Sequence, residues 1–172
     1  MKTLPNIQRI LFVRTDRIGD TLMNVPAIRL LRQTYPKSWI TLLCDKVVAP
    51  LFEGHPDIDE VMPVDPAALR SGIKPHFELF RKIEKANFQL AVISNPNKFF
   101  HAAVFFARIP HRVGYGRKWG FFLNHTLPDD KDKSLRHEID SNLNLVHRVS
   151  DLSWDGVLKL PVSDRALAKV KE

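Results

Sequence analysis

Residues 9–20 read RILFVRTDRIGD, an apolar run followed by a short polar loop that ends in a Gly-Asp step. The run Arg9–Arg14 is partly β-branched and has polar ends, which is the pattern of a buried strand. A helical pattern follows as far as Tyr35, and Pro26 within it should start a second helical segment or bend the first. A strand, a loop and a helix in this order predict the first half of a βαβ unit.

The rest of the chain repeats this alternation. Further strands are expected at Trp39–Cys44, at Glu60–Val64 (an edge strand, because it contains Pro63), at Gln89–Ser94 and at Arg112–Tyr115. Helices are expected at Val47–Phe52, Phe77–Ala86, Lys98–Ala107 and His137–Val149, and a short extended segment at Leu158–Val162. The pattern predicts an α/β, Rossmann-like three-layer domain with a mainly parallel sheet over residues 1–160. Residues 161–172 are expected to begin a linker or helix, with Ser163 as the N-cap.

Composition narrows the class of protein further. The chain has 172 residues, with 26 Lys and Arg against 19 Asp and Glu, a length that suits one domain. A single cysteine, Cys44, excludes an internal disulfide and a cysteine-based metal cage, and it is expected in the core. The histidines lack metal-ligand spacing, and Asp129–Asp132 is expected to be a solvated loop. The longest strictly apolar run is too short for a membrane span, and no signal-peptide pattern is present. We therefore expect a cytoplasmic protein.

The charge is unevenly distributed along the chain. No Asp or Glu occurs between Glu84 and Asp129, whereas this stretch holds six Lys or Arg residues. Either the stretch concentrates anionic ligands, or its counter-charges come from elsewhere in the fold. No nucleic-acid-binding motif accompanies it, so nucleic acid is not an expected partner. Three Phe pairs lie within the stretch: Phe99-Phe100, Phe105-Phe106 and Phe121-Phe122. Most of these rings are expected in the core, and the alternative is a basic-aromatic lip on an anionic leaflet.

Open parallel sheets bind ligands beyond the carboxyl ends of their strands. This rule selects the loops Thr15–Asp20, Asn95–Lys98 and Gly116–Lys118. The first loop lacks the glycine patterns of dinucleotide and P-loop sites, which disfavours an oxidoreductase half-domain. Asp20, at the start of the predicted helix, has two interpretations. A helix-capping role is favoured by the pattern alone, and the other interpretation is a carboxylate that accepts a proton from a substrate hydroxyl.

Residues 14–36, RTDRIGDTLMNVPAIRLLRQTYP, resemble the opening of the family 9 glycosyltransferases, the ADP-heptose:lipopolysaccharide heptosyltransferases. Two later blocks, Arg112–Arg117 and His137–Leu145, are also similar to that family. The resemblance runs from about Ile10 to the end of the chain. It covers only the N-terminal, acceptor-side half of the family's proteins.

The resemblance implies a GT-B architecture, in which two Rossmann-like domains face each other across a cleft. It implies an inverting transfer that needs no metal, with Asp20 as the catalytic general base, and this shifts our interpretation of Asp20 from cap to base. No cofactor is implied; the nucleotide-sugar donor, ADP-heptose, is bound mainly by a C-terminal domain that has no counterpart here. The chain alone is therefore expected to transfer very little sugar. The alternative is a non-catalytic Rossmann-like module that binds an anionic glycolipid or a protein partner.

The implied acceptor is an anionic glycolipid of the lipopolysaccharide core, reached by peripheral contact with the inner membrane. The acceptor-binding candidates are Arg17, Lys98, Arg112, Arg117, Lys118 and His137. Guanidinium groups suit carboxylates and phosphates. Arg17 either positions the acceptor or pairs with Asp16, and His137 either contacts the acceptor or caps a helix. The loop 94–98, SNPNK, departs from many relatives, so the exact acceptor stays open.

Overall fold

A computed structural model describes residues 3–128 and 137–158. Three expectations lie wholly or mostly outside these ranges. They are the Asp129–Asp132 loop, the extended segment Leu158–Val162 and the linker or helix at 161–172. No helix within the described part of the chain combines the length and the apolar character needed to cross a membrane.

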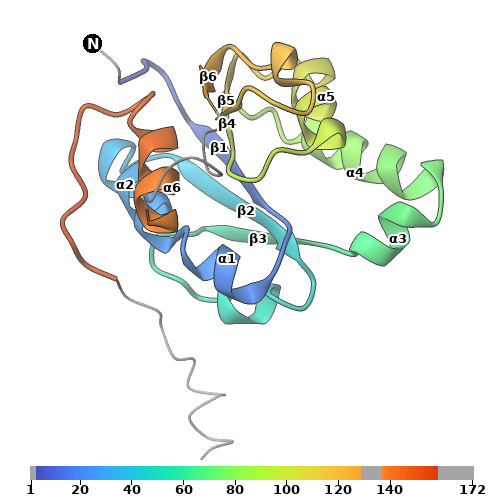
Figure 1. The fold of residues 1–172 in the computed structure, drawn as a ribbon, viewed down its shortest axis with the longest axis horizontal. Coiled ribbons are helices and arrows are strands. Elements are labelled where there is room, and N and C mark those ends of the chain that lie inside the picture. The colour runs from blue at the N-terminus through green and yellow to red at the C-terminus, as the bar shows by residue number, and fades with distance from the viewer. Residues whose placement is uncertain (1–2, 129–136, 159–172) are drawn as a thin grey trace, which may run out of the picture.

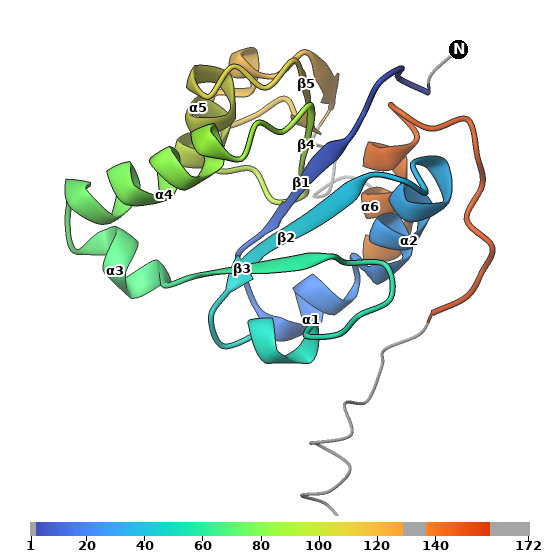
Figure 2. The same cartoon turned by 180° about the vertical axis from the view of Figure 1, so that it is seen from behind.

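Six strands form one sheet, as Figures 1 and 2 show. They are β1 (Arg9–Arg14), β2 (Trp39–Asp45), β3 (Glu60–Val64), β4 (Leu90–Ile93), β5 (His111–Tyr115) and β6 (His125–Leu127). Their order is β3-β2-β1-β4-β5-β6, and every neighbouring pair is parallel. The predicted α/β class is confirmed, and so is the edge position of β3. The three-residue strand β6 was not predicted.

Helices connect these strands. The α-helices are α1 (Ile18–Leu22), α2 (Val25–Thr34), α3 (Pro66–Arg70), α4 (Ile73–Lys85), α5 (Lys98–Phe106) and α6 (Glu138–Val146), and the 3-10 helices are η1 (Ala49–Leu51) and η2 (Gly120–Phe122). Pro26 lies in the first turn of α2, where its missing N–H costs no helical hydrogen bond. The expected helical break before Pro26 is therefore confirmed. The prediction missed α3, although Asp65 caps it by accepting a hydrogen bond from the Ala67 amide.

Two apolar clusters cover the two faces of the sheet. In β1, Ile10 and Phe12 belong to one cluster, with side chains of α2 and α6, whereas Leu11 and Val13 belong to the other, with side chains of α4 and α5. Because successive residues of a strand point to opposite faces, this assignment gives three layers. Both views show α2 beside α6 and, away from them, α4 with α5 (Figures 1 and 2).

Polar contacts close the layer that contains α2 and α6. The Tyr35 hydroxyl donates to the Val149 carbonyl at 2.5 Å. Arg29 on α2 donates to both carboxylate oxygens of Asp155, and this hydrogen-bonded pairing lowers the pKa of Asp155 to about 2. The segment after α6 is thus tied back onto the second helix of the chain.

The expectation that most paired phenylalanines lie in the core was wrong. Phe100 is buried, whereas Phe105, Phe106 and Phe121 keep 41%, 60% and 76% of their surface exposed. The physical reason is geometric. The side of α5 that meets the sheet is filled by Phe100, Ala103 and Val104, so the last two phenylalanines of the helix project outward.

Candidate functional site

The loops selected from the sequence lie at one edge of the sheet. Strand β4 is the direct neighbour of β1, and β5 follows β4. The three parallel strands therefore present their carboxyl ends together, at a spacing of roughly 4.8 Å per strand. After β1 come Arg17 and, in the first turn of α1, Asp20; Lys98 begins α5 after β4, and the loop after β5 carries Arg117 and Lys118. The structure thus brings the predicted carboxylate and four of the predicted cations to the same edge.

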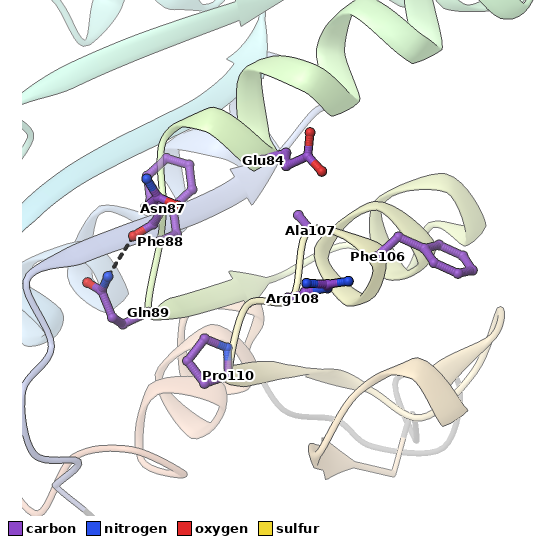
Figure 3. A pocket seen from close by; sticks show the side chains of 8 residues that line it. All are labelled: Glu84, Asn87, Phe88, Gln89, Phe106, Ala107, Arg108 and Pro110. Atoms are coloured by element: carbon purple, nitrogen blue, oxygen red, sulfur yellow. Dashed lines mark hydrogen bonds between the residues drawn. The ribbon is translucent and has the colours of Figure 1, made fainter.

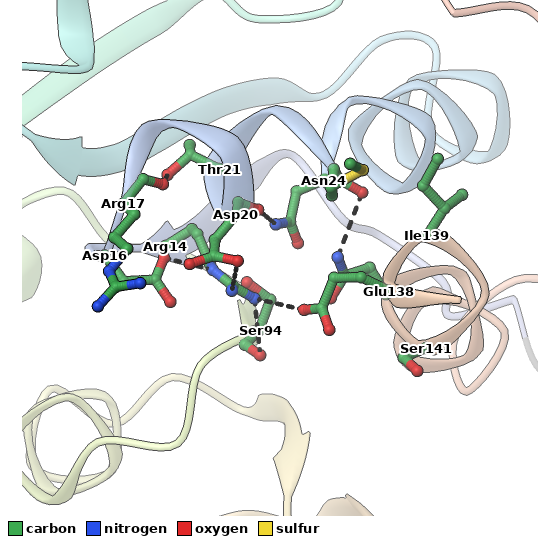
Figure 4. A network of polar contacts seen from close by, with 12 residues as sticks. Arg14, Asp16, Arg17, Asp20, Thr21, Asn24, Ser94, Glu138, Ile139 and Ser141 are labelled. Atoms are coloured by element: carbon green, nitrogen blue, oxygen red, sulfur yellow. Dashed lines mark hydrogen bonds and ion pairs between the residues drawn. The ribbon is translucent and has the colours of Figure 1, made fainter. Parts of the chain in front are cut away.

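Arg14, the last residue of β1, is the centre of a polar network at this edge (Figure 4). Its side chain is only 4% exposed, yet it approaches three carboxylates. Its nitrogens lie 2.5 Å from an Asp16 oxygen, 3.1 Å from a Glu138 oxygen and 3.8 Å from an Asp20 oxygen. A nitrogen of the same guanidinium also lies 3.5 Å from the Ser94 carbonyl. A buried guanidinium requires such partners, because an unpaired buried charge is costly.

Asp20 is the most exposed of the three carboxylates, with 44% of its side-chain surface accessible against 31% for Asp16 and 28% for Glu138. It lies in the first turn of α1, whose N-cap is Arg17. The Arg17 side chain makes no capping hydrogen bond, and Asp20 is the acidic residue of this first turn, where its negative charge suits the helix dipole. The Asp20 backbone carbonyl accepts a hydrogen bond of 2.7 Å from the Asn24 side chain. That bond steadies the backbone and leaves the carboxylate facing Arg14 and solvent.

Residues of α6, more than 100 positions after Arg14 in the sequence, pack against the site. His137 is the N-cap of α6, and its Nδ1 accepts a hydrogen bond from the Ile139 amide, so its capping role is the one observed. The next residue, Glu138, pairs with Arg14. Asn142 is fully buried and donates to the Met23 carbonyl at 3.2 Å. Helix α6 therefore holds both Arg14 and the turn between α1 and α2.

Lys98 and the loop after β5 are in contact. The Lys98 ammonium lies 5.6 Å from the centre of the Trp119 ring, within the range of a cation–π interaction. Lys118 and Trp119 both have left-handed backbones, with φ of 51° and 70°. Non-glycine residues rarely adopt this conformation, and two in succession are a local strain of the kind found at functional sites. The loop thus presents a cation and a large aromatic ring together.

Two further candidate cations are Arg17 and Arg112. Pairing with Asp16 was one of two interpretations of Arg17, and the ion pair found for Asp16 among the described residues is with Arg14. Arg112 lies near the start of β5, and its guanidinium donates to the Ile109 and Phe122 carbonyls at 2.5 and 2.7 Å. Arg112 therefore braces the loops at the amino end of the sheet and is not brought to the edge that carries Asp20.

A pocket of about 320 Å³ opens at the same carboxyl edge, between the loop after β1 and helices α3, α4 and α5. Its polar lining comes from Thr15, Arg70, His76, Asn95 and Asn97, and its apolar lining includes Phe99 and Phe100. The Asn95 side-chain oxygen is buried and has no hydrogen-bond partner among the described residues. A pocket that combines phenylalanine rings with polar groups, one of them unsatisfied, suits a sugar ring.

Four residues of this edge were not predicted as site residues from the sequence: Arg14, Arg70, His76 and Glu138. One signal was available, since Arg14 is a charged residue at the end of an otherwise apolar strand and must find partners when buried. Its partner Glu138 is 124 residues away. No local pattern indicates that pairing.

Two remaining predictions concern cysteine and metal. Cys44 is buried, as expected, and burial raises the pKa of its thiol to about 12. It is therefore a neutral packing residue. Within residues 3–128 and 137–158, no group of three or more His, Cys, Asp or Glu side chains is arranged to hold a metal ion.

Comparisons with known proteins point in one direction, although no family model matches the chain. Lipopolysaccharide heptosyltransferase 2 of Salmonella typhimurium is 30% identical over 128 residues, which cover 72% of this chain and 36% of that protein. A family 9 glycosyltransferase structure from Veillonella parvula superimposes with a TM-score of 0.82 at 20% identity, covering 98% of this chain and 50% of that one. An E. coli heptosyltransferase solved with ADP-2-deoxy-2-fluoro heptose gives a TM-score of 0.72 at 17% identity, covering 87% and 50%. The chain thus spans about a third to a half of the proteins that it matches.

Proposed function

Because the chain is related to the family 9 glycosyltransferases, we propose that it is the acceptor-binding half of an inverting heptosyltransferase. It takes part in sugar transfer from a nucleotide-activated donor, ADP-heptose, to a glycan of the lipopolysaccharide core. The donor is bound mainly by a second domain, and no metal takes part. The observation that carries the proposal is the half-exposed Asp20 carboxylate at the carboxyl edge, 3.8 Å from a nitrogen of the buried Arg14 guanidinium.

In this proposal Asp20 is the catalytic base. Its carboxylate accepts the proton of an acceptor hydroxyl while the hydroxyl oxygen attacks the anomeric carbon of the donor. The bond between that carbon and the diphosphate oxygen breaks, and the diphosphate leaves with the electron pair. Attack from the face opposite the leaving group inverts the anomeric centre. Arg14 fixes the orientation of the carboxylate, and Asp16 and Glu138 hold Arg14 in turn.

The acceptor lies along the same edge. Arg17, Lys98, Arg117 and Lys118 supply positive charge for the carboxylates and phosphates of a lipopolysaccharide core. The pocket lined by Thr15, Asn95 and Arg70 receives one of its sugar rings. Lysine and arginine from three neighbouring loops give the acceptor several anchoring points, which orient its hydroxyl towards Asp20. His137 remains a candidate for contact with the acceptor, because it precedes Glu138, which pairs with Arg14 at the same edge.

The lipid portion of such an acceptor stays in a bilayer. We therefore place the protein in the cytoplasm, in peripheral contact with the inner membrane. Peripheral contact requires no membrane-spanning segment.

A two-step assay tests the proposal. The 172-residue chain alone should bind a deacylated lipopolysaccharide core but give negligible turnover of ADP-heptose, because the proposal assigns donor binding to a second domain and these residues span only about half of the family 9 structure that they match. Lys98→Gln should weaken core binding several-fold, whereas Lys37→Gln, at an exposed lysine on the opposite edge of the sheet, should not. Supplying a donor-binding half should restore transfer. If the chain binds the lipopolysaccharide core but gives no transfer with a donor-binding half present, the alternative of a non-catalytic module is supported. Robust turnover by the chain alone would contradict the assignment of donor binding to a second domain.

A further inference from the structure

Exposed aromatic side chains gather on one side of the molecule, on α4, α5 and η2. All four phenylalanines of the described residues that are classed as exposed lie there: Phe77, Phe105, Phe106 and Phe121. Ile73, 87% exposed, and Trp119, 46% exposed, belong to the same side. We call these six residues the aromatic band.

The band is continuous. Phe105 and Phe106 each contact the half-buried Phe122, at centroid distances of 4.9 and 5.7 Å. Phe122 in turn contacts Phe121 at 4.4 Å and Trp119 at 6.1 Å. On the other side, Phe106 shares a groove of about 520 Å³ with Ile73 and Phe77 of α4. The groove is lined almost entirely by apolar side chains, so one apolar surface extends from α4 to η2.

Cations border the band, and the segment from α5 to η2 carries no carboxylate of its own, although Glu84 at the end of α4 lines the same pocket as Phe106. No acidic residue occurs between positions 84 and 129. Lys98 lies over the Trp119 ring at 5.6 Å, and Arg112 lies over the Phe105 ring at 5.3 Å. Arg108, held in a left-handed conformation after α5, lines a pocket beside Phe106, and Figure 3 shows the two side chains next to each other.

We propose that the aromatic band is a docking surface for an anionic phospholipid bilayer. Aromatic rings partition into the interface between headgroups and acyl chains, and lysine and arginine at the same depth bind the phosphates. The absence of carboxylates along α5 and η2 favours this occupant, because an acidic membrane surface repels carboxylates. Exposed phenylalanines would gain little from a nucleic-acid backbone, whereas they gain directly from lipid.

The position of the band relative to the carboxyl edge supports the same conclusion. Lys98 begins α5 at the carboxyl edge and contacts Trp119, whereas Phe105 and Phe106 end that helix. The band therefore reaches the edge that carries Asp20 at Trp119, beside Lys98, and extends from there along α5 to the other end of that helix. This inference deepens the proposed function by naming the membrane-contacting surface, but the binding itself requires neither donor nor acceptor.

Vesicle co-sedimentation of the full chain tests the proposal without any glycolipid. Binding to vesicles of phosphatidylcholine with 30% phosphatidylglycerol is expected, at least tenfold tighter than to phosphatidylcholine alone. The double variant Phe106→Ser/Phe121→Ser should lose at least tenfold in binding. The matched control is Val47→Ser/Leu51→Ser, which removes two exposed apolar side chains near η1, and it should bind like the parent chain.

A second measurement locates the contact. Brominated lipids should quench the fluorescence of Trp119 on binding, and Trp119→Phe should remove the quenching while Trp39→Phe leaves it. Equal binding to neutral and anionic vesicles, no binding, or equal loss in the control variant would overturn the proposal. The proposal would also be overturned if the parent chain did not bind vesicles but self-associated, and if the Phe106→Ser/Phe121→Ser variant did not self-associate. A second copy of the chain would then occupy the band. If the chain bound vesicles but a protein that also carries the donor half did not, the donor half would be the partner that covers the band, and the proposal would be overturned.

Vesicle binding and sugar transfer are separate readouts. Binding to anionic vesicles without transfer in the presence of a donor half would support the docking surface and contradict the proposed reaction. Transfer to a deacylated core without binding to vesicles would support the proposed reaction and contradict the docking surface.

Discussion

The two helical layers of the sheet differ in how completely they bury their apolar residues. In α2, six of the ten residues are buried, and α6 packs directly on it. In α4, only Leu79 and Ile83 of thirteen residues are buried, although the helix also carries Ile73 and Phe77. The layer of α2 and α6 is thus a closed core that also delivers Glu138 to Arg14. The layer of α4 and α5 has apolar surface beyond what its core needs, and such surface indicates a binding role.

The sharpest test of this difference compares two phenylalanines of one helix. Phe100→Ala removes a ring that is 1% exposed and should destabilise the protein by about 3–5 kcal/mol. Phe106→Ala removes a ring that is 60% exposed and should change the free energy of unfolding by less than about 0.5 kcal/mol. Urea unfolding followed by circular dichroism measures both. Similar losses for the two variants would mean that Phe106 belongs to the core after all.

The closed layer depends on the charge network around Arg14. Arg14→Met should cost about 3 kcal/mol, because it leaves three carboxylates without their shared cation at the end of β1. Arg9→Met, at the other and more exposed end of the same strand, is the matched control and should cost less than about 1 kcal/mol. Thermal unfolding measures the stability of both variants. Equal losses in stability would mean that the Arg14 network contributes no more than an arginine at the other end of the strand.

A smaller effect is expected at Gly114 in β5, between the two layers. A Cβ atom there would lie 2.8 Å from the Leu123 Cδ1 atom and 3.2 Å from the Ile93 carbonyl oxygen. Gly114→Ala should therefore destabilise the protein by about 1–3 kcal/mol. Gly19→Ala, where an added Cβ meets no atom within 4 Å, is the control, and its thermal midpoint should stay close to that of the parent.

The smallest effect concerns the pH dependence of the α4 and α5 layer. Burial lowers the pKa of His101, which is fully buried on α5. As the pH falls through about 6.5, the ordinary histidine value, the unfolded chain binds a proton at this position more readily than the folded chain does. The free energy of unfolding should therefore fall as pH decreases from 7.5 to 5.5. His101→Gln should flatten that dependence, and an unchanged slope in unfolding titrations would show that other groups cause it.

Most of the sheet could be predicted because its strands are continuous apolar runs between polar loops. Residues 9–14, 39–45 and 60–64 carry that signal locally. Strand β6 does not, because it has three residues and forms by pairing with β5, a contact that no local pattern indicates. The outward direction of Phe105, Phe106 and Phe121 could not be predicted either. It depends on which side of α5 meets the sheet, and composition favours burial for every phenylalanine.

For the candidate site too, the residues with a local signal could be predicted and those that depend on distant contacts could not. Asp20 and the loops with Lys98 and Lys118 follow from the rule that parallel sheets bind ligands at their carboxyl edge. The partnership of Arg14 with Glu138 and the pocket lined by Arg70 and Asn95 depend on contacts between distant segments. The placement of Arg112 was predicted at this edge, but backbone carbonyls hold its guanidinium elsewhere.

The most direct test of the central claim is the transfer rate of Asp20→Asn compared with Asp16→Asn, measured with a donor-binding half present. Both substitutions remove one carboxylate beside Arg14, but only Asp20 is assigned to the reacting hydroxyl. Asp20→Asn should lower kcat by about 10²–10⁴-fold with acceptor binding retained, and Asp16→Asn should have a much smaller effect. Full activity in Asp20→Asn, or equal losses in the two variants, would contradict the assignment of Asp20 as the base.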